Sequence, residues 1–441
     1  MIRSYLYAIV FNLGILIFVH ELGHYLAARI SGVTVERFSM GFGPRILKFT
    51  RGATEYALSL IPFGGYVKMS GMEQAPEGSE PDLGPGTFLG KPLGVRAAIV
   101  ASGPVTNLVW AYLVIVGVLV FSGLPTLGEP VVGEVEPDSA AGRAGLMLGD
   151  RIASVEGVEV DGWDDVVEIA AEDEDGAIDL VVVRGEEPGV SVEVSLPYEE
   201  DAQSGGIDLG LTAYVPPVIG DVLEGGPADR AGMEAGDRVV SVGGHEVRTW
   251  SELGGVIYES AGLELDIVWE RGGATMSAKV VPEEGEEAVS NTEVRTVGMI
   301  GIMRSWENER LGFGAALVTA LELTWVNLRA IFGFFVGLAT GRVSGSMVGG
   351  PIRVVQMASE SARWGATYFF SFMAFMSLNL FIINMLPLPI LDGGHLLLMA
   401  LERVRGRGLS ERQLMVWQQV GLVFFVGLMA FLLVRDAVGL G

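Results

Sequence analysis

Four stretches of the chain are made almost wholly of apolar residues and are long enough to cross a membrane. They lie at about residues 5–30, 97–121, 367–388 and 416–434. Each supplies roughly 20 mostly apolar residues, which is the length that a hydrocarbon layer ~30 Å thick demands. The pattern therefore predicts a polytopic α-helical membrane protein with about four transmembrane helices.

A fifth apolar stretch, residues 311–339, differs from these four because it also contains Glu322, Asn327 and Arg329. Charged groups are costly inside a membrane-spanning helix. We therefore expect this stretch to form an amphipathic helix that lies on the membrane or on the protein surface.

The charges of the connecting loops predict the orientation of these spans. The loop after the first span carries Arg37, Arg45, Lys48, Arg51, Lys68, Lys91 and Arg96, and the loop before the last span carries Arg403, Arg405, Arg407 and Arg412. Both loops lie on the same side of a four-span protein, and basic loops mark the cytoplasmic side. We expect a multi-pass protein of a bacterial inner membrane, with the residues between the second and third spans in the periplasm.

The composition of the chain separates two very different regions. Residues 122–310 contain 41 acidic and 11 basic residues, a net charge of −30, whereas the rest contains 13 acidic and 18 basic residues, a net charge of +5. Nucleic-acid binding needs clustered Lys and Arg to neutralise phosphates, so no nucleic-acid partner is expected. The absence of Cys excludes thiol nucleophiles and Cys-ligated zinc. An acidic, soluble insert thus interrupts an apolar, slightly basic chain.

The acidic insert contains an internal repeat. Residues 143–163 read RAGLMLGDRIASVEGVEVDGW and residues 230–250 read RAGMEAGDRVVSVGGHEVRTW, with a constant offset of 87. A repeat at a fixed period indicates two copies of one module. The pattern A-G-x-x-x-G-D-R-[IV]-x-S-V resembles PDZ domains, which accept an extended peptide as an added strand. The resemblance implies two inserted α+β PDZ-like domains, and whether they bind peptide ends or serve only as spacers stays open.

The first span contains the sequence His20-Glu21-Leu22-Gly23-His24. Residues four apart lie on the same face of a helix, so both imidazoles can reach one metal ion with Glu21 beside them. Ionisable groups inside a span cost on the order of 2.5–3.5 kcal/mol and are usually functional. The alternative is that these side chains face lipid headgroups at a helix end. The context favours a metal site.

A catalytic zinc ion takes three protein ligands and keeps one position open, so His20 and His24 need a partner. The best candidate is Asp392, at the end of the third span, which the topology places on the same side as the end of the first span. His395 is an alternative ligand, although a role beside the ligands suits it better. His245 lies in the second repeat copy, on the other side of the membrane.

These features together resemble the site-2 protease family of intramembrane metalloproteases. The motifs that carry the resemblance are H-E-x-x-H in the first span, the N-x-x-P-x-P-x-L-D-G block of residues 384–393, and the tandem PDZ-like modules. Further matches are Ser102-Gly-Pro-Val-Thr-Asn107, Pro62-Phe-Gly-Gly-Tyr-Val-Lys68 and Gly349-Gly-Pro-Ile352. The resemblance covers nearly the whole chain.

The resemblance implies one Zn²⁺ per chain, held by His20, His24 and Asp392. Glu21 is then implied to take a proton from the attacking water and to pass it to the leaving amine. Zinc lowers the pKa of a bound water to about 7 and polarises the scissile carbonyl, so the chemistry needs no Ser or Cys nucleophile.

The resemblance also implies a group of substrate-binding residues. Asn384 is implied to hold an unwound stretch of substrate, because a side-chain amide can pair with both backbone N–H and C=O groups. Pro387 and Pro389 break the helix and free backbone groups at membrane depth. Gly103 and Asn107 form a G-x-x-x-N motif, in which the small residue permits close helix approach. A plain interhelical hydrogen bond by Asn107 is equally compatible with the sequence.

Residues 38–61 alternate between polar and apolar positions around an Arg51-Gly52 turn, a pattern that predicts a β-hairpin. The family resemblance implies that this hairpin is re-entrant and dips toward the active site. Its edge strand would hold the substrate in an extended form, because a helical substrate hides its peptide bonds. The expected parts of the chain, in order, are the N-terminal membrane half (1–121), two PDZ-like domains (129–215 and 216–285), the amphipathic helical region (305–365) and the C-terminal membrane half (366–441).

The sequence thus predicts a zinc-dependent intramembrane endopeptidase that cleaves single-span membrane proteins, with its active site near the cytoplasmic side. By resemblance, the substrates are an anti-sigma factor already cut by a first protease and remnant signal peptides, in regulated intramembrane proteolysis of an envelope stress response. The alternative is a non-catalytic PDZ-bearing membrane scaffold, which leaves the polar residues of the spans unexplained. A zinc transporter would need charged residues along several spans.

Overall fold

The computed structural model describes residues 12, 14–72, 83–172, 177–185, 190–197, 199–200, 207–290, 293–407 and 410–438. The chain divides into two compact units. The membrane unit combines the residues up to Phe121 with those from Leu311 onward, and the insert unit is Ser122–Arg310. Each unit is described by itself.

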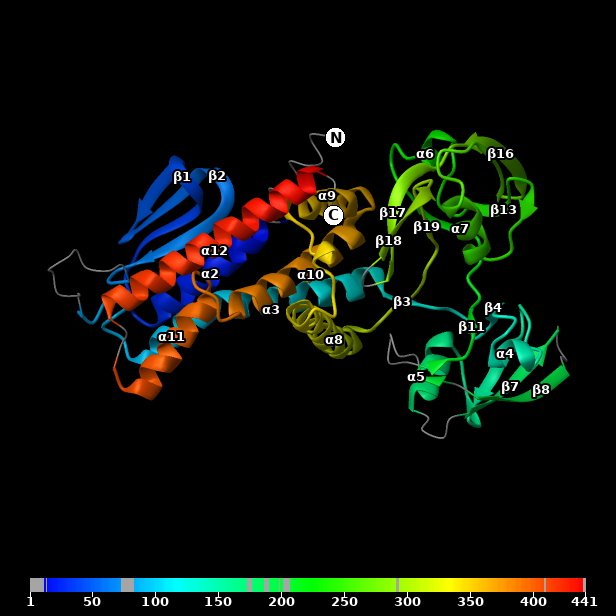
Figure 1. Cartoon of the computed structure of the whole chain (residues 1–441), viewed down its shortest axis with the longest axis horizontal. Helices are drawn as coiled ribbons and strands as arrows, with labels where there is room; N and C mark the ends of the chain where they lie inside the picture. The colour runs from blue at the N-terminus through cyan, green and yellow to red at the C-terminus, as the bar shows by residue number, and fades with distance from the viewer. Residues whose placement is uncertain are drawn as a thin grey trace. The chain divides into compact units, whose positions relative to one another are not determined.

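The membrane unit is built from helices and one long β-hairpin. Its elements are α2 (Gly14–Ile30), β1 (Val35–Arg51), β2 (Thr54–Met69), α3 (Leu93–Ser122), α8 (Phe313–Thr340), η2 (Gly345–Met347), α9 (Pro351–Arg363), α10 (Ala366–Met385), α11 (Asp392–Arg405) and α12 (Glu411–Val438). Figure 1 shows α2, α3, α10 and α12 running lengthwise across the view, with the hairpin beside α2.

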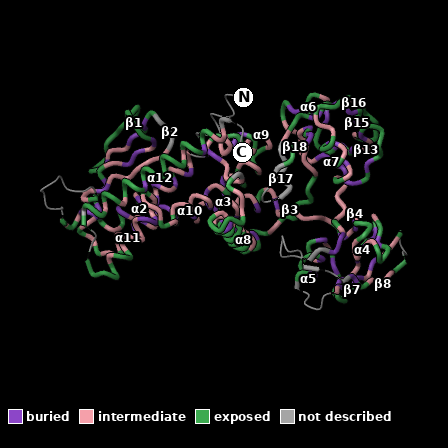
Figure 2. The backbone as a smooth tube through the Cα atoms, viewed as in Figure 1, coloured by how far each residue is buried: buried purple, intermediate pink, exposed green. Residues whose placement is uncertain are grey.

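Four of the described helices are long and apolar enough to cross a membrane. They are Leu93–Ser122, Phe313–Thr340, Ala366–Met385 and Arg412–Asp436. Helix α2 is not among them, since it has 17 residues as described. Most of residues 5–13 of the expected first span lie outside the described part. Most residues of α12 are exposed (Figure 2). Its apolar side chains include Val423, which is 74% exposed, and Val434, which is 63% exposed. Apolar side chains in such numbers on an outer helix are typical of a surface that faces lipid.

Helix α8 occupies the expected fifth stretch but is more apolar than an amphipathic helix. One face packs Ile331 against Leu378 and Ile382 of α10, while Leu321 and Trp325 are more than 60% exposed. The side chain of Asn327 donates a hydrogen bond to the carbonyl of Leu323 within the helix. Glu322 and Arg329 are both exposed. The helix is also long and apolar enough to cross a membrane, so the amphipathic surface helix expected from the sequence stays a prediction. Figure 1 views α8 along its axis, so α8 runs transverse to α3, α10 and α12.

The expected hairpin is present and is longer than residues 38–61. Its strands β1 and β2 are bent, so residues 54–58 of β2 pair both with residues 47–51 and with residues 37–40 of β1. Residues 65–69 of β2 pair with the other side of residues 35–40. Residues 65–69 therefore form one edge of the sheet, outside the range expected from the sequence. The sheet is attached to α2 through the Tyr25 and Tyr56 hydroxyls, which lie 2.6 Å apart.

The insert unit contains two modules with the same strand order. The first has β4 (Val132–Val135), α4 (Ala140–Arg143), β5 (Arg151–Val155), β6 (Val158–Glu159), α5 (Trp163–Glu172), β7 (Ala177–Arg184), β8 (Val190–Pro197), β9 (Glu199–Glu200), β10 (Ile207–Asp208) and β11 (Leu211–Ala213). The second has β12 (Ile219–Val222), α6 (Pro227–Arg230), β13 (Arg238–Val242), β14 (His245–Glu246), α7 (Trp250–Tyr258), β15 (Leu265–Arg271), β16 (Ala274–Val280), β17 (Glu283–Ser290), β18 (Glu293–Met299) and β19 (Ile302–Arg304). The sheets have the orders β6-β5-β7-β8 and β14-β13-β15-β16, as two copies of one sequence should.

The second module continues beyond residue 285, the limit expected from the sequence. Strand β19 pairs with β12, and Ile300 belongs to the same buried core as Ile219 and Trp269. The module therefore closes only when the chain returns to its first strand. Strands β3 (Leu124–Thr126) and β20 (Glu307–Glu309) pair with each other where the insert unit begins and ends.

Each module contains one buried aspartate that forms an ion pair, and the two aspartates occupy equivalent positions of the repeat. Asp150 binds Arg184 at 2.6 Å, and Asp237 binds Arg271 at 2.6 Å. Each carboxylate also accepts a backbone N–H, from Met147 in the first module and from Glu234 in the second. Burial raises the pKa of Asp237, but the hydrogen bonds from Arg271 and the Glu234 N–H outweigh it and hold that pKa below its ordinary value.

Asp237→Asn is expected to destabilise the second module by about 2 kcal/mol at pH 7, because Arg271 loses its charged partner. Because the pKa of this carboxyl is lower in the folded protein than in the unfolded chain, its charged form stabilises the fold at pH values above the ordinary pKa of about 4. This stabilisation is lost as the pH falls through the pKa of the folded protein. The difference between wild type and variant should therefore shrink on acidification. Hydrogen exchange of β13 and β15 between pH 7 and 3 measures it.

Lys279→Met is the matched control, because the exposed pair of Lys279 with Glu264 contributes little to stability. Equal exchange rates in wild type and Asp237→Asn at pH 7 would contradict the role of the buried pair.

Candidate metal centre

Three side chains from distant parts of the sequence meet at one point in the membrane unit. His20 Nε2 lies 3.2 Å from His24 Nε2 and 3.2 Å from Asp392 Oδ2, and His24 Nε2 lies 3.5 Å from the same oxygen. Nitrogen and oxygen ligands of a tetrahedral zinc ion lie roughly 3.3–3.5 Å from one another. The three atoms thus have the spacing of one face of a zinc tetrahedron. Within the described ranges no other cluster of His, Asp or Glu is arranged to hold a metal.

Helices α2 and α3 approach closely at two glycines, and this approach orients His24. A Cβ atom on Gly23 would lie 2.4 Å from the carbonyl oxygen of Ser102, and a Cβ atom on Gly103 would lie 2.3 Å from His24 Nε2. Any larger residue at either position would force the helices or the imidazole to move. Gly103 therefore makes room for a metal ligand and presents no side chain to a substrate.

The other ring nitrogen of each histidine faces α3. His24 Nδ1 donates a hydrogen bond to the carbonyl of Ile99 at 2.9 Å, so its Nε2 lone pair is free to bind a metal. His20 Nδ1 lies 3.3 Å from the Asn107 amide, and Asn107 is fully buried. Both predicted residues of the G-x-x-x-N motif thus contact the histidines.

The chain bends sharply between α10 and α11 to deliver Asp392. Helix α10 ends at Met385, and Asp392 is the first residue of α11. Between them Ile390 has a φ of +81°, a conformation that is strained for a β-branched residue. A Cβ on Gly394 would lie 2.1 Å from the carbonyl oxygen of Leu388. Only glycine therefore lets the first turn of α11 pack this closely against the segment between α10 and α11.

The remaining predicted residues lie along the same segment. Asn384 is half-buried in the last turn of α10 and makes no hydrogen bond with any described residue. Pro387 is exposed, and Pro389 is in contact range of Gly421 on α12. His395 lies in the first turn of α11 outside the cluster of ligand atoms, and His245 is exposed on β14.

Glu21 is nearly buried, at 9% exposure, and lies against the hairpin. A Cβ on Gly65 would be 2.8 Å from Glu21 Cγ, so the edge segment of β2 passes directly beside this side chain. Gly65 was not predicted as a site residue. The signal for it was the Gly64-Gly65 pair inside a strand, since glycine in a strand often marks a close approach.

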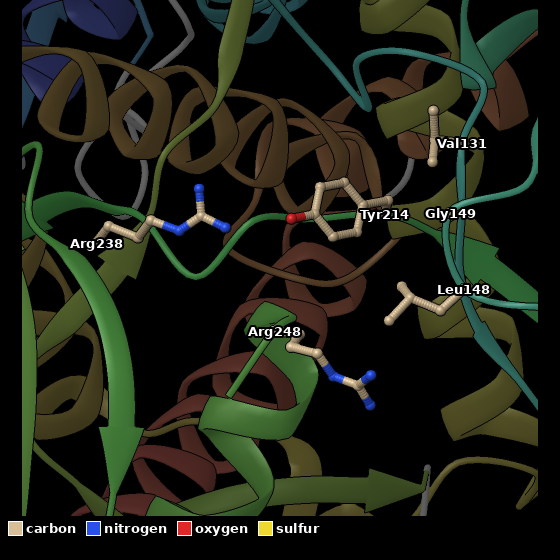
Figure 3. Close-up of a pocket in the computed structure, with 6 residues that line it drawn as sticks. All are labelled: Val131, Leu148, Gly149, Tyr214, Arg238 and Arg248. Atoms are coloured by element: carbon tan, nitrogen blue, oxygen red, sulfur yellow. The ribbon is translucent and has the colours of Figure 1, made fainter. Parts of the chain in front are cut away.

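The insert unit has a separate shallow cavity of about 310 Å³. It is lined by Val131, Leu148, Gly149, Tyr214, Arg238 and Arg248. Figure 3 shows the Tyr214 hydroxyl pointing toward Arg238. These lining residues include no histidine and no carboxylate.

Comparison with known proteins shows the family of this chain. The family described as Peptidase family M50 matches residues 8–428. The chain is 34% identical to the regulator of sigma-E protease RseP of Salmonella typhimurium, over 97% of both chains. It is 34% identical to RseP of Escherichia coli, over 96% of both chains, and 35% identical to a Neisseria meningitidis protein whose name describes a zinc metalloprotease, over 97% of this chain and 96% of that one.

Among solved structures, a PDZ domain of an SdrC-like protein from Listeria monocytogenes matches 21% of this chain and 90% of its own length. The sequence identity is 20% and the TM-score is 0.17.

Gly103→Ala is expected to lower zinc affinity by at least about 10-fold, because the added methyl group occupies the place of the His24 ring. Zinc content after dialysis against a graded chelator series measures the change. Gly117→Ala on the same helix is the control, since nothing lies within 4 Å of its added Cβ. Unchanged zinc affinity in Gly103→Ala would show that the ring does not need this space.

Proposed function

The chain belongs to peptidase family M50, and we propose that His20, His24 and Asp392 hold the zinc ion of this metalloendopeptidase while Glu21 moves the proton. The protein is a zinc-dependent intramembrane protease with several membrane-spanning helices. One observation carries the residue assignment. Three ligand atoms from α2 and α11 have the separations of a tetrahedral zinc face, and Glu21 is adjacent to them in sequence.

The groups of the site have separate roles in peptide hydrolysis. Zinc, when bound, lowers the pKa of water to about 7 and polarises the scissile carbonyl. Glu21 accepts the proton of the attacking water and returns it to the leaving amine. The buried surroundings of Glu21 exclude bulk water, which strengthens the electrostatic interactions of the reaction.

The hairpin supplies the surface on which a substrate is extended. Residues 65–69 form one edge of its sheet and begin at Gly65, beside Glu21. A substrate segment that adds to this edge as a strand exposes its peptide bonds at the metal. On this basis we propose that the hairpin is re-entrant, that is, that it enters the membrane and returns to the same side. The free amide of Asn384 then holds the opposite side of the extended segment, beside the irregular backbone at Pro387 and Pro389.

The substrates proposed for this protein are single-span membrane proteins of the anti-sigma-factor type, after a first cleavage outside the membrane, and remnant signal peptides. RseP of Escherichia coli is named as a regulator of a sigma factor, which supports this class. The protein lies in the inner membrane. We propose that the active site faces the cytoplasm and that the insert unit lies in the periplasm, because the loops at the proposed cytoplasmic side are rich in Arg and Lys. A non-catalytic scaffold gives no reason for two histidines and an aspartate to converge.

Glu21→Gln is expected to reduce cleavage by about 10²–10⁴-fold, because the amide cannot accept a proton. Zinc should stay bound, since Glu21 is not one of the proposed ligands. The assay uses purified protein in detergent and a single-span substrate without its outer domain, with and without a zinc chelator.

Two further variants make this test specific. Glu322→Gln, on an exposed position of α8, is the charge-matched control and should cleave normally. His20→Ala should lose zinc and activity together. Normal cleavage by Glu21→Gln, or cleavage that resists the chelator, would remove Glu21 and zinc from the mechanism.

The insert unit is proposed to act as a size filter that keeps uncut substrates away from the site. Because Thr126 of β3 and Glu307 of β20 are paired neighbours, an Asn-Gly turn can replace residues 127–306 and leave the strand pair closed. The shortened protein should cleave a substrate that still carries its bulky outer domain, which wild type should spare. Both proteins should cleave the trimmed substrate equally. If the intact substrate stays resistant, the filter hypothesis is wrong.

A further inference from the structure

Asn107 lies where three helices of the membrane unit meet. It belongs to α3 and is fully buried. Its side-chain amide lies 3.3 Å from His20 Nδ1 on α2, and its backbone carbonyl accepts a hydrogen bond of 2.8 Å from Ser377 Oγ on α10. Its backbone is thus held on one side while its side chain contacts the histidine on the other.

The positions of the three ligand atoms decide which ring nitrogen of His20 carries the proton. His20 presents Nε2 to His24 and Asp392, so a bound metal takes the lone pair of Nε2. A neutral imidazole that binds through Nε2 carries its proton on Nδ1. That N–H faces the fully buried Asn107 at the contact of α2 with α3. It needs an acceptor there, as the His24 N–H finds in the carbonyl of Ile99.

The Asn107 amide supplies this acceptor in one of its two orientations. In the structure the nitrogen Nδ2 faces His20, and Oδ1 has no hydrogen-bond partner among the described residues. The oxygen and nitrogen of an amide have nearly the same shape, and their assignment follows from the hydrogen-bond network. Rotating the amide by half a turn brings Oδ1 to the His20 N–H and gives that oxygen a partner.

We propose that Asn107 is a positioning residue of the metal centre, whose Oδ1 accepts the Nδ1 proton of His20 and so fixes the tautomer and ring orientation that present Nε2 to zinc. This inference rests on the proposed zinc site. It replaces the expected role of Asn107 in binding substrate, since the described contacts of this amide are with a proposed ligand.

The pairing of the two histidines with Gly103 and Asn107 also explains why the H-E-x-x-H and G-x-x-x-N motifs have the same spacing of four residues. His20 and His24 are four residues apart on α2, and Gly103 and Asn107 are four residues apart on α3. The contacts pair His24 with Gly103 and His20 with Asn107, so the helices run in opposite directions. Four residues correspond to about 6 Å along a helix axis, slightly more than one turn, so the two positions on each helix are equally far apart and each histidine meets its own partner.

The test measures zinc affinity in the purified full-length protein, by competition with a chromophoric chelator in detergent. Asn107→Ala removes the acceptor without adding volume, and it should weaken zinc binding by about 10–100-fold. Asn107→Asp keeps an oxygen acceptor and should bind zinc as tightly as wild type or more tightly. Ser377→Ala is the matched control, because it loses a buried hydrogen bond at the same level of α3 and touches no ligand.

Each combination of results decides the matter. Weak zinc binding in Asn107→Ala, with rescue in Asn107→Asp and normal binding in Ser377→Ala, supports the inference. Wild-type affinity in Asn107→Ala, or equal losses in Asn107→Ala and Ser377→Ala, overturns it, as does a failure of Asn107→Asp to bind better than Asn107→Ala. Failure of the zinc site itself gives a different result, in which wild type binds no zinc or His20→Ala binds it as tightly as wild type.

Discussion

The close approach of α2 and α3 at Gly23 and Gly103 is the contact on which the metal centre depends. An imidazole fills the space that a Cβ on Gly103 would need, so the helix separation and the His24 position are set together. Because both histidines share one face of α2, placing one ring also places the other. Asp392 then meets them only because strained and glycine-rich backbone bends the chain between α10 and α11.

Several buried polar groups in the membrane unit have specific partners, which offset the cost of placing a polar group in an apolar environment. The Ile99 carbonyl accepts the His24 N–H, Ser377 donates to the backbone of Asn107, and Asn327 bonds within its own helix. Glu21, by contrast, makes no hydrogen bond with a described residue although it is nearly buried. A base that must exchange protons with water and substrate needs that freedom.

The insert unit follows a different design, in which the same small module occurs twice. Each copy places a buried aspartate beside an arginine 34 residues later, so the repeat preserves an ion pair as well as a strand order. Most of the net charge of −30 lies outside these pairs. A large excess of negative charge favours solubility and is repelled by anionic lipid headgroups.

The sequence by itself determined the features that depend on local spacing. Helical periodicity put His20 and His24 on one face, the fixed offset revealed two modules, and the prolines with Asp392 marked the end of α10. Only the tertiary structure decided which elements cross. It turned α8 transverse to α3 and α10, put the edge segment at residues 65–69, and directed Gly103 and Asn107 toward histidines. The physical reason is that a residue's spacing fixes the face it occupies, whereas its partner depends on how other elements pack against that face.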